Sequence, residues 1–266
     1  MNRTKRWAIV FLACVFLMGG IFLNTVGDQG AMAFARKQAS SKLITNPDKT
    51  VELKQISPKV WVHTTYGDYN GASRVPSNGL LIQTTKGLVL VDSTWNDALT
   101  KELLALIRQN FDRKLSVAVI THSHFDRMGG IRALQQAGIE VRTTIKTAKL
   151  AQAEGYPAPD VFLDNRPRFQ VGSTIIETMY PGEGHTKDNI TVWLPQHQVL
   201  FGGCLVKSLE SKDMGNVDDA NLKAWSDSIQ KVRERYPNAE QVVPGHGKWG
   251  YQRLLTHTLD LLEQQQ

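Results

Sequence analysis

Residues 117–130 read VAVITHSHFDRMGG, and this stretch decides how the chain is expected to fold. An apolar run typical of a buried strand leads into His122, His124 and Asp126, which alternate before a double glycine. Extended backbone puts alternate side chains on one face, so His122 and His124 can converge. Imidazole nitrogen and carboxylate oxygen are ligands that suit zinc. We therefore predict a metal-binding turn between a strand and a helix, rather than a polar loop with incidental histidines.

Three further segments place a candidate ligand in a glycine-rich turn beside an expected strand. They are GEGH at 182–185, GGC at 202–204 and PGHG at 244–247. Each alone is weak evidence, because such a histidine can cap a turn or lie on the surface and such a cysteine can lie in the core. Together with the first turn they hold four of the seven histidines, which argues against chance.

Six ligands are too many for one tetrahedral zinc ion. They suit two sites of three protein ligands each, with open positions for water, as catalytic zinc requires. We expect the first site to consist of His122, His124 and His185, and the second of Asp126, Cys204 and His246. The other histidines, His63, His197 and His257, lack this context and are interpreted as structural or surface residues.

The pattern along the rest of the chain alternates short apolar runs with helical periodicity, which indicates an α/β architecture. Several runs are apolar throughout, such as residues 88–91, and are expected to be covered on both faces. Two packed sheets with helices outside would satisfy this. The expected strands are 60–64, 80–84, 88–92, 117–121, 139–143, 174–179, 190–194, 199–202 and 241–243, and the expected helices start near 97, 129, 146, 218 and 251.

The first 33 residues have the pattern of a secretory signal peptide: a basic start, an uncharged run over 7–23 and a small-x-small end at 31–33. We predict cleavage after Ala33 and export. The alternatives are an uncleaved membrane anchor, because 17 apolar residues approach the spanning minimum of roughly 17–25, and lipidation at Cys14.

Composition excludes several classes of protein. Hydrophobic residues make up 41% and charged residues 21% of the 266 residues, which is typical of a globular protein rather than a disordered, collagen-like or multi-span membrane protein. The net charge of +6 is not gathered into a Lys/Arg stripe with interleaved aromatics, so no nucleic-acid partner is expected. Without the leader, Cys204 is the remaining cysteine, and a metal that holds it as a thiolate would explain its presence in an exported protein.

The set of motifs resembles the metallo-β-lactamase superfamily, and within it the subclass B1 metallo-β-lactamases. The HxHxD turn is shared by many superfamily members, whereas the combination of Cys204, Lys207 and His246 is typical of far fewer of them. Arg127 departs from the cysteine found in many B1 enzymes, although arginine is compatible with the subclass. The motifs that carry the resemblance are 75–79, 90–95, 122–130, 180–186, 202–207, 215–216 and 243–247.

This resemblance implies an αβ/βα sandwich of two mixed sheets with helices on the outer faces, formed by a single catalytic domain at 34–266. It implies an exported, periplasmic or secreted monomer with two Zn²⁺ ions per chain. The implied reaction is hydrolysis of the β-lactam amide bond of penicillins, cephalosporins and carbapenems, which confers antibiotic resistance. Water activated by zinc would attack the lactam carbonyl without a covalent acyl-enzyme, and Asp126 would hold the attacking hydroxide.

The resemblance also implies residues that contact substrate. Lys207 would bind the substrate carboxylate, and Asn216 would polarise the lactam carbonyl or else form a turn. Residues 66–74, here called the flap, would cover the cleft, with Tyr69 in apolar contact with the substrate. Trp95 would line the rim near the zinc ions, unless it lies in the core. Asp92, at the end of an apolar strand, would support the ligands from behind.

Two other functions stay open on the sequence alone. One is another hydrolase of the same superfamily, acting on thioesters, lactones or phosphodiesters, which Cys204 with Lys207 disfavours. The other is a non-catalytic zinc-binding protein.

Overall fold

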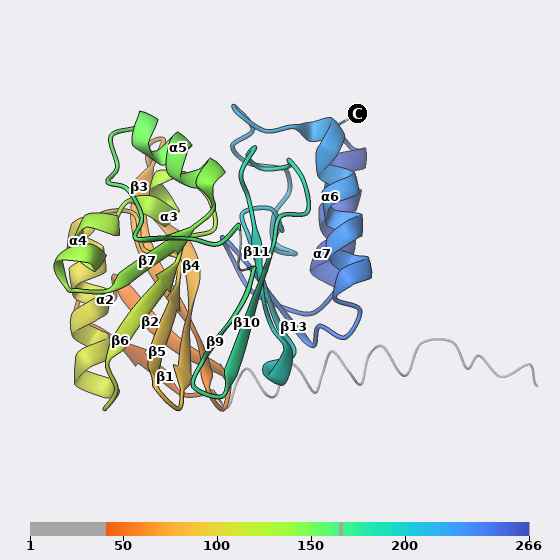
Figure 1. Ribbon diagram of the computed structural model, residues 1–266. Coiled ribbons are helices and arrows are strands. Elements are labelled where there is room, and N and C mark those ends of the chain that lie inside the picture. Colours follow the sequence, from red (N-terminus) through yellow and green to blue (C-terminus); the bar gives the residue numbers. More distant parts are fainter. Residues whose placement is uncertain (1–40, 165–166, 266) are drawn as a thin grey trace, which may run out of the picture.

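The computed structural model describes residues 41–164 and 167–265, which form two packed β-sheets with helices on both outer sides (Figure 1). This arrangement confirms the predicted α/β sandwich. The expected leader, with its cleavage position and Cys14, lies outside the described residues. Within the described part of the chain, no helix has the length and apolar character needed to cross a membrane.

The strands fall into one large and one small mixed sheet. The eight-stranded sheet has the order β1-β2-β3-β4-β5-β6-β7-β8, and the five-stranded sheet has the order β13-β12-β11-β10-β9. The first sheet consists of β1 (Leu43–Thr45), β2 (Val51–Ser57), β3 (Val60–Tyr69), β4 (Ala72–Thr84), β5 (Gly87–Val91), β6 (Leu115–Val119), β7 (Glu140–Thr143) and β8 (Val161–Phe162). The second consists of β9 (Arg168–Val171), β10 (Thr174–Met179), β11 (Thr191–Leu194), β12 (Val199–Gly203) and β13 (Gln241–Pro244).

Helices cover the outer face of each sheet, as the figure shows (Figure 1). Apolar residues of α2 and α4 pack on the eight-stranded sheet, and those of α6 and α7 pack on the five-stranded sheet. The helical segments are α2 (Asp97–Asn110), α3 (Phe125–Met128), α4 (Ile131–Gln136), α5 (Ile145–Ala153), η1 (Pro195–His197), α6 (Leu222–Arg235) and α7 (Arg253–Glu263).

Strand periodicity explains why the strands are apolar throughout. Along β5, Leu88 and Leu90 belong to the core under the helices, whereas Val89 and Val91 belong to the core between the two sheets. Successive side chains of a strand point to opposite faces, so a strand covered on both sides needs apolar residues at every position. The central layer holds the two sheets together by this continuous buried surface.

The flap is the end of the β-hairpin formed by β3 and β4, whose pairing shifts register between Gly67 and Tyr69. Strands β3 and β4 run past the lengths expected from the sequence and are joined by Asn70 and Gly71, whose φ angles are +48° and +78°. Two central residues with positive φ are typical of a type I′ hairpin turn, for which Asn-Gly is the preferred pair. The pairing of Tyr69 with Ala72 places Tyr69 next to this turn.

Other differences from the expected elements have local causes. The helix expected near Asp218 begins at Leu222, because the Asn221 side chain accepts a hydrogen bond from Ala224 N and caps it there. Strands β1, β2, β8 and β9 were not predicted. Strand β2 alternates the buried Val51 and Leu53 with the partly exposed Glu52 and Lys54, but this period is interrupted at Gln55, where the pairing with β3 shifts register.

Candidate metal centre

The HxHxD turn follows β6, and two buried carboxylates accept hydrogen bonds from the residues on either side of His122. Asp92 accepts hydrogen bonds from Thr121 N at 2.7 Å and from Thr121 Oγ1 at 2.9 Å. Asp188 accepts a hydrogen bond from Ser123 N at 2.9 Å. These bonds fix the backbone on both sides of His122. The double glycine is needed because a Cβ at either position would overlap neighbouring atoms, Trp95 O in the case of Gly129.

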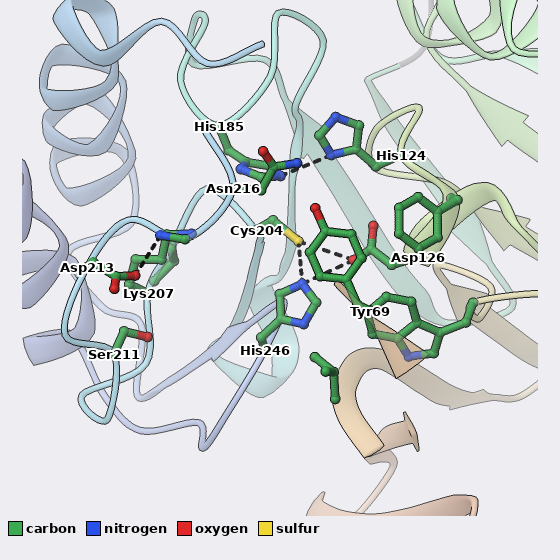
Figure 2. Close-up of a pocket in the computed structure, with 15 residues that line it drawn as sticks. Tyr69, His124, Asp126, His185, Cys204, Lys207, Ser211, Asp213, Asn216 and His246 are labelled. Carbon is green, nitrogen blue, oxygen red and sulfur yellow. Dashed lines mark hydrogen bonds and ion pairs between the residues drawn. The ribbon is translucent and has the colours of Figure 1, made fainter. Parts of the chain in front are cut away.

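The first expected donor set is brought together by the fold. One nitrogen from each of His122, His124 and His185 lies within 4.8 Å of the others. Nδ1 of His124 lies 3.2 Å from Nε2 of His185, and the two rings are perpendicular, with their centres 5.0 Å apart (Figure 2). His122 Nε2 is buried and has no hydrogen-bond partner among the described residues. A buried polar atom without a partner is costly, so this nitrogen fits a metal ligand.

The second expected donor set is equally compact. Asp126 Oδ2 lies 3.1 Å from His246 Nε2, and Cys204 Sγ lies 3.3 Å from that nitrogen and 3.6 Å from the carboxylate oxygen (Figure 2). Zinc bonds of about 2.0 Å to nitrogen or oxygen and about 2.3 Å to sulfur, at tetrahedral angles, would separate the donors by roughly 3.3–3.6 Å. The three atoms are therefore spaced to fit one face of a zinc coordination tetrahedron.

Arg127 is a buried cation that contacts this same donor set. Its Nη2 lies 2.9 Å from Asp126 Oδ2, 3.1 Å from Cys204 Sγ and 3.4 Å from His246 Nε2. The side chain is fully buried, and its other nitrogen, Nη1, donates to Asn78 O and lies 3.5 Å from Asp92. The guanidinium thus balances the anionic donors and would stand beside any cation bound to them.

The electrostatics of the two donor sets differ. Burial lowers the pKa of His122 and of His185 well below 6.5, so both rings are neutral and ready to bind metal near pH 7. Burial alone would also lower the pKa of His246, but contact with Cys204 and Asp126 raises it to about 9. Burial would raise the pKa of Asp126, yet Arg127 and His246 hold it well below its usual value.

Lys207 and Asn216 lie on the wall of the cleft next to the donor atoms (Figure 2). Lys207 is half-buried, its Nζ lies 5.2 Å from the centre of the Trp225 ring, and burial lowers its pKa. Asn216 Oδ1 accepts a hydrogen bond from Asp218 N at 3.1 Å, which closes a turn over residues 216–218. Its amide nitrogen donates to none of the described residues.

Aromatic side chains form the opposite wall. Trp95 packs in the core under the helices and also lines the cleft, so it occupies both of the positions considered for it. The centre of its ring lies 6.3 Å from the ring centre of Tyr69 and 5.5 Å from that of Phe125. The ring centres of Tyr69 and Phe125 are 5.6 Å apart. The wall thus unites the flap, the segment after β5 and the metal-binding turn.

Sequence reasoning missed several residues of the site, among them Phe125, Asp188, Asp219, Ser211 and Asp213. Phe125 is 40% exposed and lies between the expected ligands His124 and Asp126, so its position in the sequence could have indicated that it lines the site. Asp188 and Asp219 gave no such indication, because a lone aspartate in a loop is usually solvated. Of the three histidines set aside, His63 is buried in β3 and bonded to Val91 O, as expected of a structural residue.

Comparison with known proteins agrees with this geometry. The family model described as the metallo-beta-lactamase superfamily matches residues 72–246. A metallo-beta-lactamase type 2 from Bacillus sp. (strain 170) is 48% identical, and one from Bacillus cereus is 47% identical, each over 94% of this chain and 96% of the relative. The solved metallo-beta-lactamase from Pontibacter korlensis superposes with a TM-score of 0.78 at 47% identity, covering 80% of this chain and 99% of its own. The chain therefore belongs to the metallo-β-lactamase superfamily, as its motifs predict.

Proposed function

We propose that this protein hydrolyses the amide bond of β-lactams with two zinc ions, one held by each donor set. The observation that carries the proposal is one cleft that is lined by donors of both sets, by the half-buried Lys207 and by Asn216, whose amide nitrogen donates to none of the described residues. A β-lactam presents a carboxylate and a strained amide carbonyl close together, and these are the groups that Lys207 and Asn216 can bind.

The fit of the residues supports zinc as the metal. Nitrogen, carboxylate and thiolate donors suit zinc, and a three-ligand set leaves a position open, which catalytic zinc requires. When bound, zinc acidifies water, whose pKa falls to roughly 7, and stabilises developing negative charge. His122, His124 and His185 would hold the first ion, and Asp126, Cys204 and His246 the second.

The side chains around the metals orient the reactants. Lys207 pairs with the substrate carboxylate, and the Asn216 amide donates a hydrogen bond to the lactam carbonyl oxygen. The Asp126 carboxylate is kept ionised by Arg127, so it accepts a hydrogen bond from the attacking water and aligns it. Tyr69, Trp95 and Phe125 contact the apolar substituent and exclude bulk water from one side of the cleft.

The test is hydrolysis of a chromogenic cephalosporin by purified protein. We expect turnover that a chelator abolishes and added zinc restores. Absence of turnover with two zinc ions bound per chain would defeat the proposal and leave a non-catalytic zinc protein. Turnover of thioesters or phosphodiesters in place of the lactam would assign another hydrolase of the superfamily.

We further propose export through a leader at residues 1–33 and a monomeric mature chain of residues 34–266. The pattern of the first 33 residues supports the leader. N-terminal sequencing of the exported protein and its mass in solution test the two statements. A mass that still includes the leader would favour the membrane-tethered alternative.

A further inference from the structure

The loop that follows β12 carries Asp219 near its end, and the carboxylate of this residue contacts a histidine on the other side of the cleft. This substrate loop, residues 204–221, contains Cys204, Lys207 and Asn216, and it packs with the five-stranded sheet and α6. Near its end, Asp219 Oδ2 lies 3.2 Å from Nε2 of His124, which comes from the eight-stranded sheet. The contact joins the two layers of the sandwich at the mouth of the metal centre.

The geometry of His124 assigns a different task to each ring nitrogen. Its Nδ1 faces His185 Nε2 at 3.2 Å, toward the first donor set, and its Nε2 faces Asp219. An imidazole that binds metal through Nδ1 carries its proton on Nε2 and can donate it. The Asp219 carboxylate is the acceptor in reach, and such a bond fixes both the tautomer and the orientation of a metal-binding ring.

The rest of the substrate loop is anchored unevenly. Its first half is tied to α7, where Lys207 N donates to Thr258 Oγ1 at 2.9 Å and His257 Nε2 bonds Ser211 O at 3.0 Å. The second half, residues 215–220, is held to its own side of the cleft by Val217 and Ala220, which pack on the core below α6, and by short-range bonds such as Ala220 N to Val217 O at 3.1 Å. The contact of Asp219 with His124 is what ties this half to the other side of the cleft.

We propose that Asp219 is a positioning residue that couples metal at the first donor set to the order of the substrate loop. A metal that fixes His124 strengthens the Nε2–H bond to Asp219 and so holds residues 215–220, including Asn216, against the cleft. Coupling of two equilibria is reciprocal, so an ordered loop also raises the metal affinity of the first set. The functional meaning of the loop rests on the proposed lactam hydrolysis, whereas the coupling itself does not.

Metal binding by the full chain tests the coupling without any substrate. Asp219→Asn removes the charge but keeps the size, and Asp218→Asn is the matched control, because Asp218 is the exposed neighbouring acid in the same loop. Partners of this kind typically change metal affinity by about 10–100-fold. Because the Asp219 side chain is 46% exposed, we expect about tenfold weaker cobalt binding at the first set in Asp219→Asn, and wild-type affinity in Asp218→Asn. Thiolate-to-cobalt absorption distinguishes the second set, which contains the sulfur.

Amide hydrogen exchange supplies the second measurement. Metal should slow exchange over residues 215–220 in the wild-type protein and in Asp218→Asn, and much less in Asp219→Asn. Wild-type metal affinity in Asp219→Asn, or metal-induced protection equal to that of the control, would overturn the coupling. Lactam turnover by the wild-type protein is measured separately, so a failed coupling and a failed hydrolase assignment give different results.

Discussion

Replacing Gly67 with alanine should push the flap away from the cleft. Gly67 lies at the base of the flap, directly against the ring of Trp95. A Cβ there would stand 2.5 Å from Trp95 Cγ, 2.6 Å from Cδ2 and 2.8 Å from Cδ1. Carbon atoms in ordinary contact are about 3.5–4.0 Å apart, so the contact must open by about 1 Å.

The ring of Trp95 has little room to retreat. It is 7% exposed, its indole N–H donates to Thr65 O at 3.2 Å, and Phe125 packs against it. The flap therefore moves instead. Overpacking of this kind costs about 1–3 kcal/mol, and a domain of this size loses about 2–4 °C in Tm per kcal/mol. Displacement of Tyr69 from the substrate should raise KM for a cephalosporin by about tenfold, whereas zinc content stays at the wild-type value.

Thermal unfolding and steady-state kinetics measure both effects. Gly71→Ala is the control at the other end of the same hairpin, where a Cβ meets no atom within 4 Å but the φ of +78° is unfavourable. It should cost about 1 kcal/mol and leave the flap base in place. The double variant Gly67→Ala/Trp95→Phe should regain part of the lost stability, because the smaller ring makes room. Wild-type Tm and KM in Gly67→Ala would refute the reasoning.

Three further outcomes follow from the site. Cys204→Ser should weaken metal binding mainly at the second donor set, because a neutral hydroxyl is a poorer zinc ligand than a thiolate; metal analysis at limiting zinc, with equal loss at both sets, would contradict this. Lys207→Glu should raise KM for substrates with a carboxylate by like-charge repulsion, and an unchanged KM would remove Lys207 from substrate binding. In the metal-free protein the proton on His246, whose pKa is raised to about 9, competes with metal. Affinity at the second set should therefore rise by up to about tenfold per pH unit from pH 7 to 9, as that proton is lost. At the first set, where burial lowers the pKa of His122, affinity should stay flat over this range, and equal slopes in a competition titration with a chelator would contradict the assignment.

Arg127 replaces the cysteine found in many B1 enzymes, and the structure shows which groups its side chain contacts. The guanidinium contacts all three donors of the second set, as well as Asp92 behind the metal-binding turn. One buried cation thus serves both the acid that supports the turn and the acid that would bind metal. Sequence alone could not show this, because a lone arginine is usually solvated and its burial depends on the loops that surround it.

The layers of the fold and the chemistry of its turns can be predicted from the amino-acid sequence. Strands such as β5 are apolar at every position because both of their faces are covered, and that requirement is visible in the sequence. The alternation of His122 and His124 follows from the twofold period of extended backbone. The glycine-rich turns at 182–185, 202–204 and 244–247 are also visible in the sequence, but the atoms that crowd Gly184 and Gly245 belong to the distant residues Leu205 and Cys204.

Which distant groups meet, and at what distance, depends on how the two sheets and their loops pack. Asp126 and Cys204 are 78 residues apart in sequence, and His124 and Asp219 are 95 apart, so no local pattern relates them. The same holds for the aromatic wall, where Phe125 closes against the flap. Local periods are set by backbone geometry and can be predicted from neighbouring residues, whereas contacts across the cleft depend on how two sheets pack and on which loops their strand order brings to one edge.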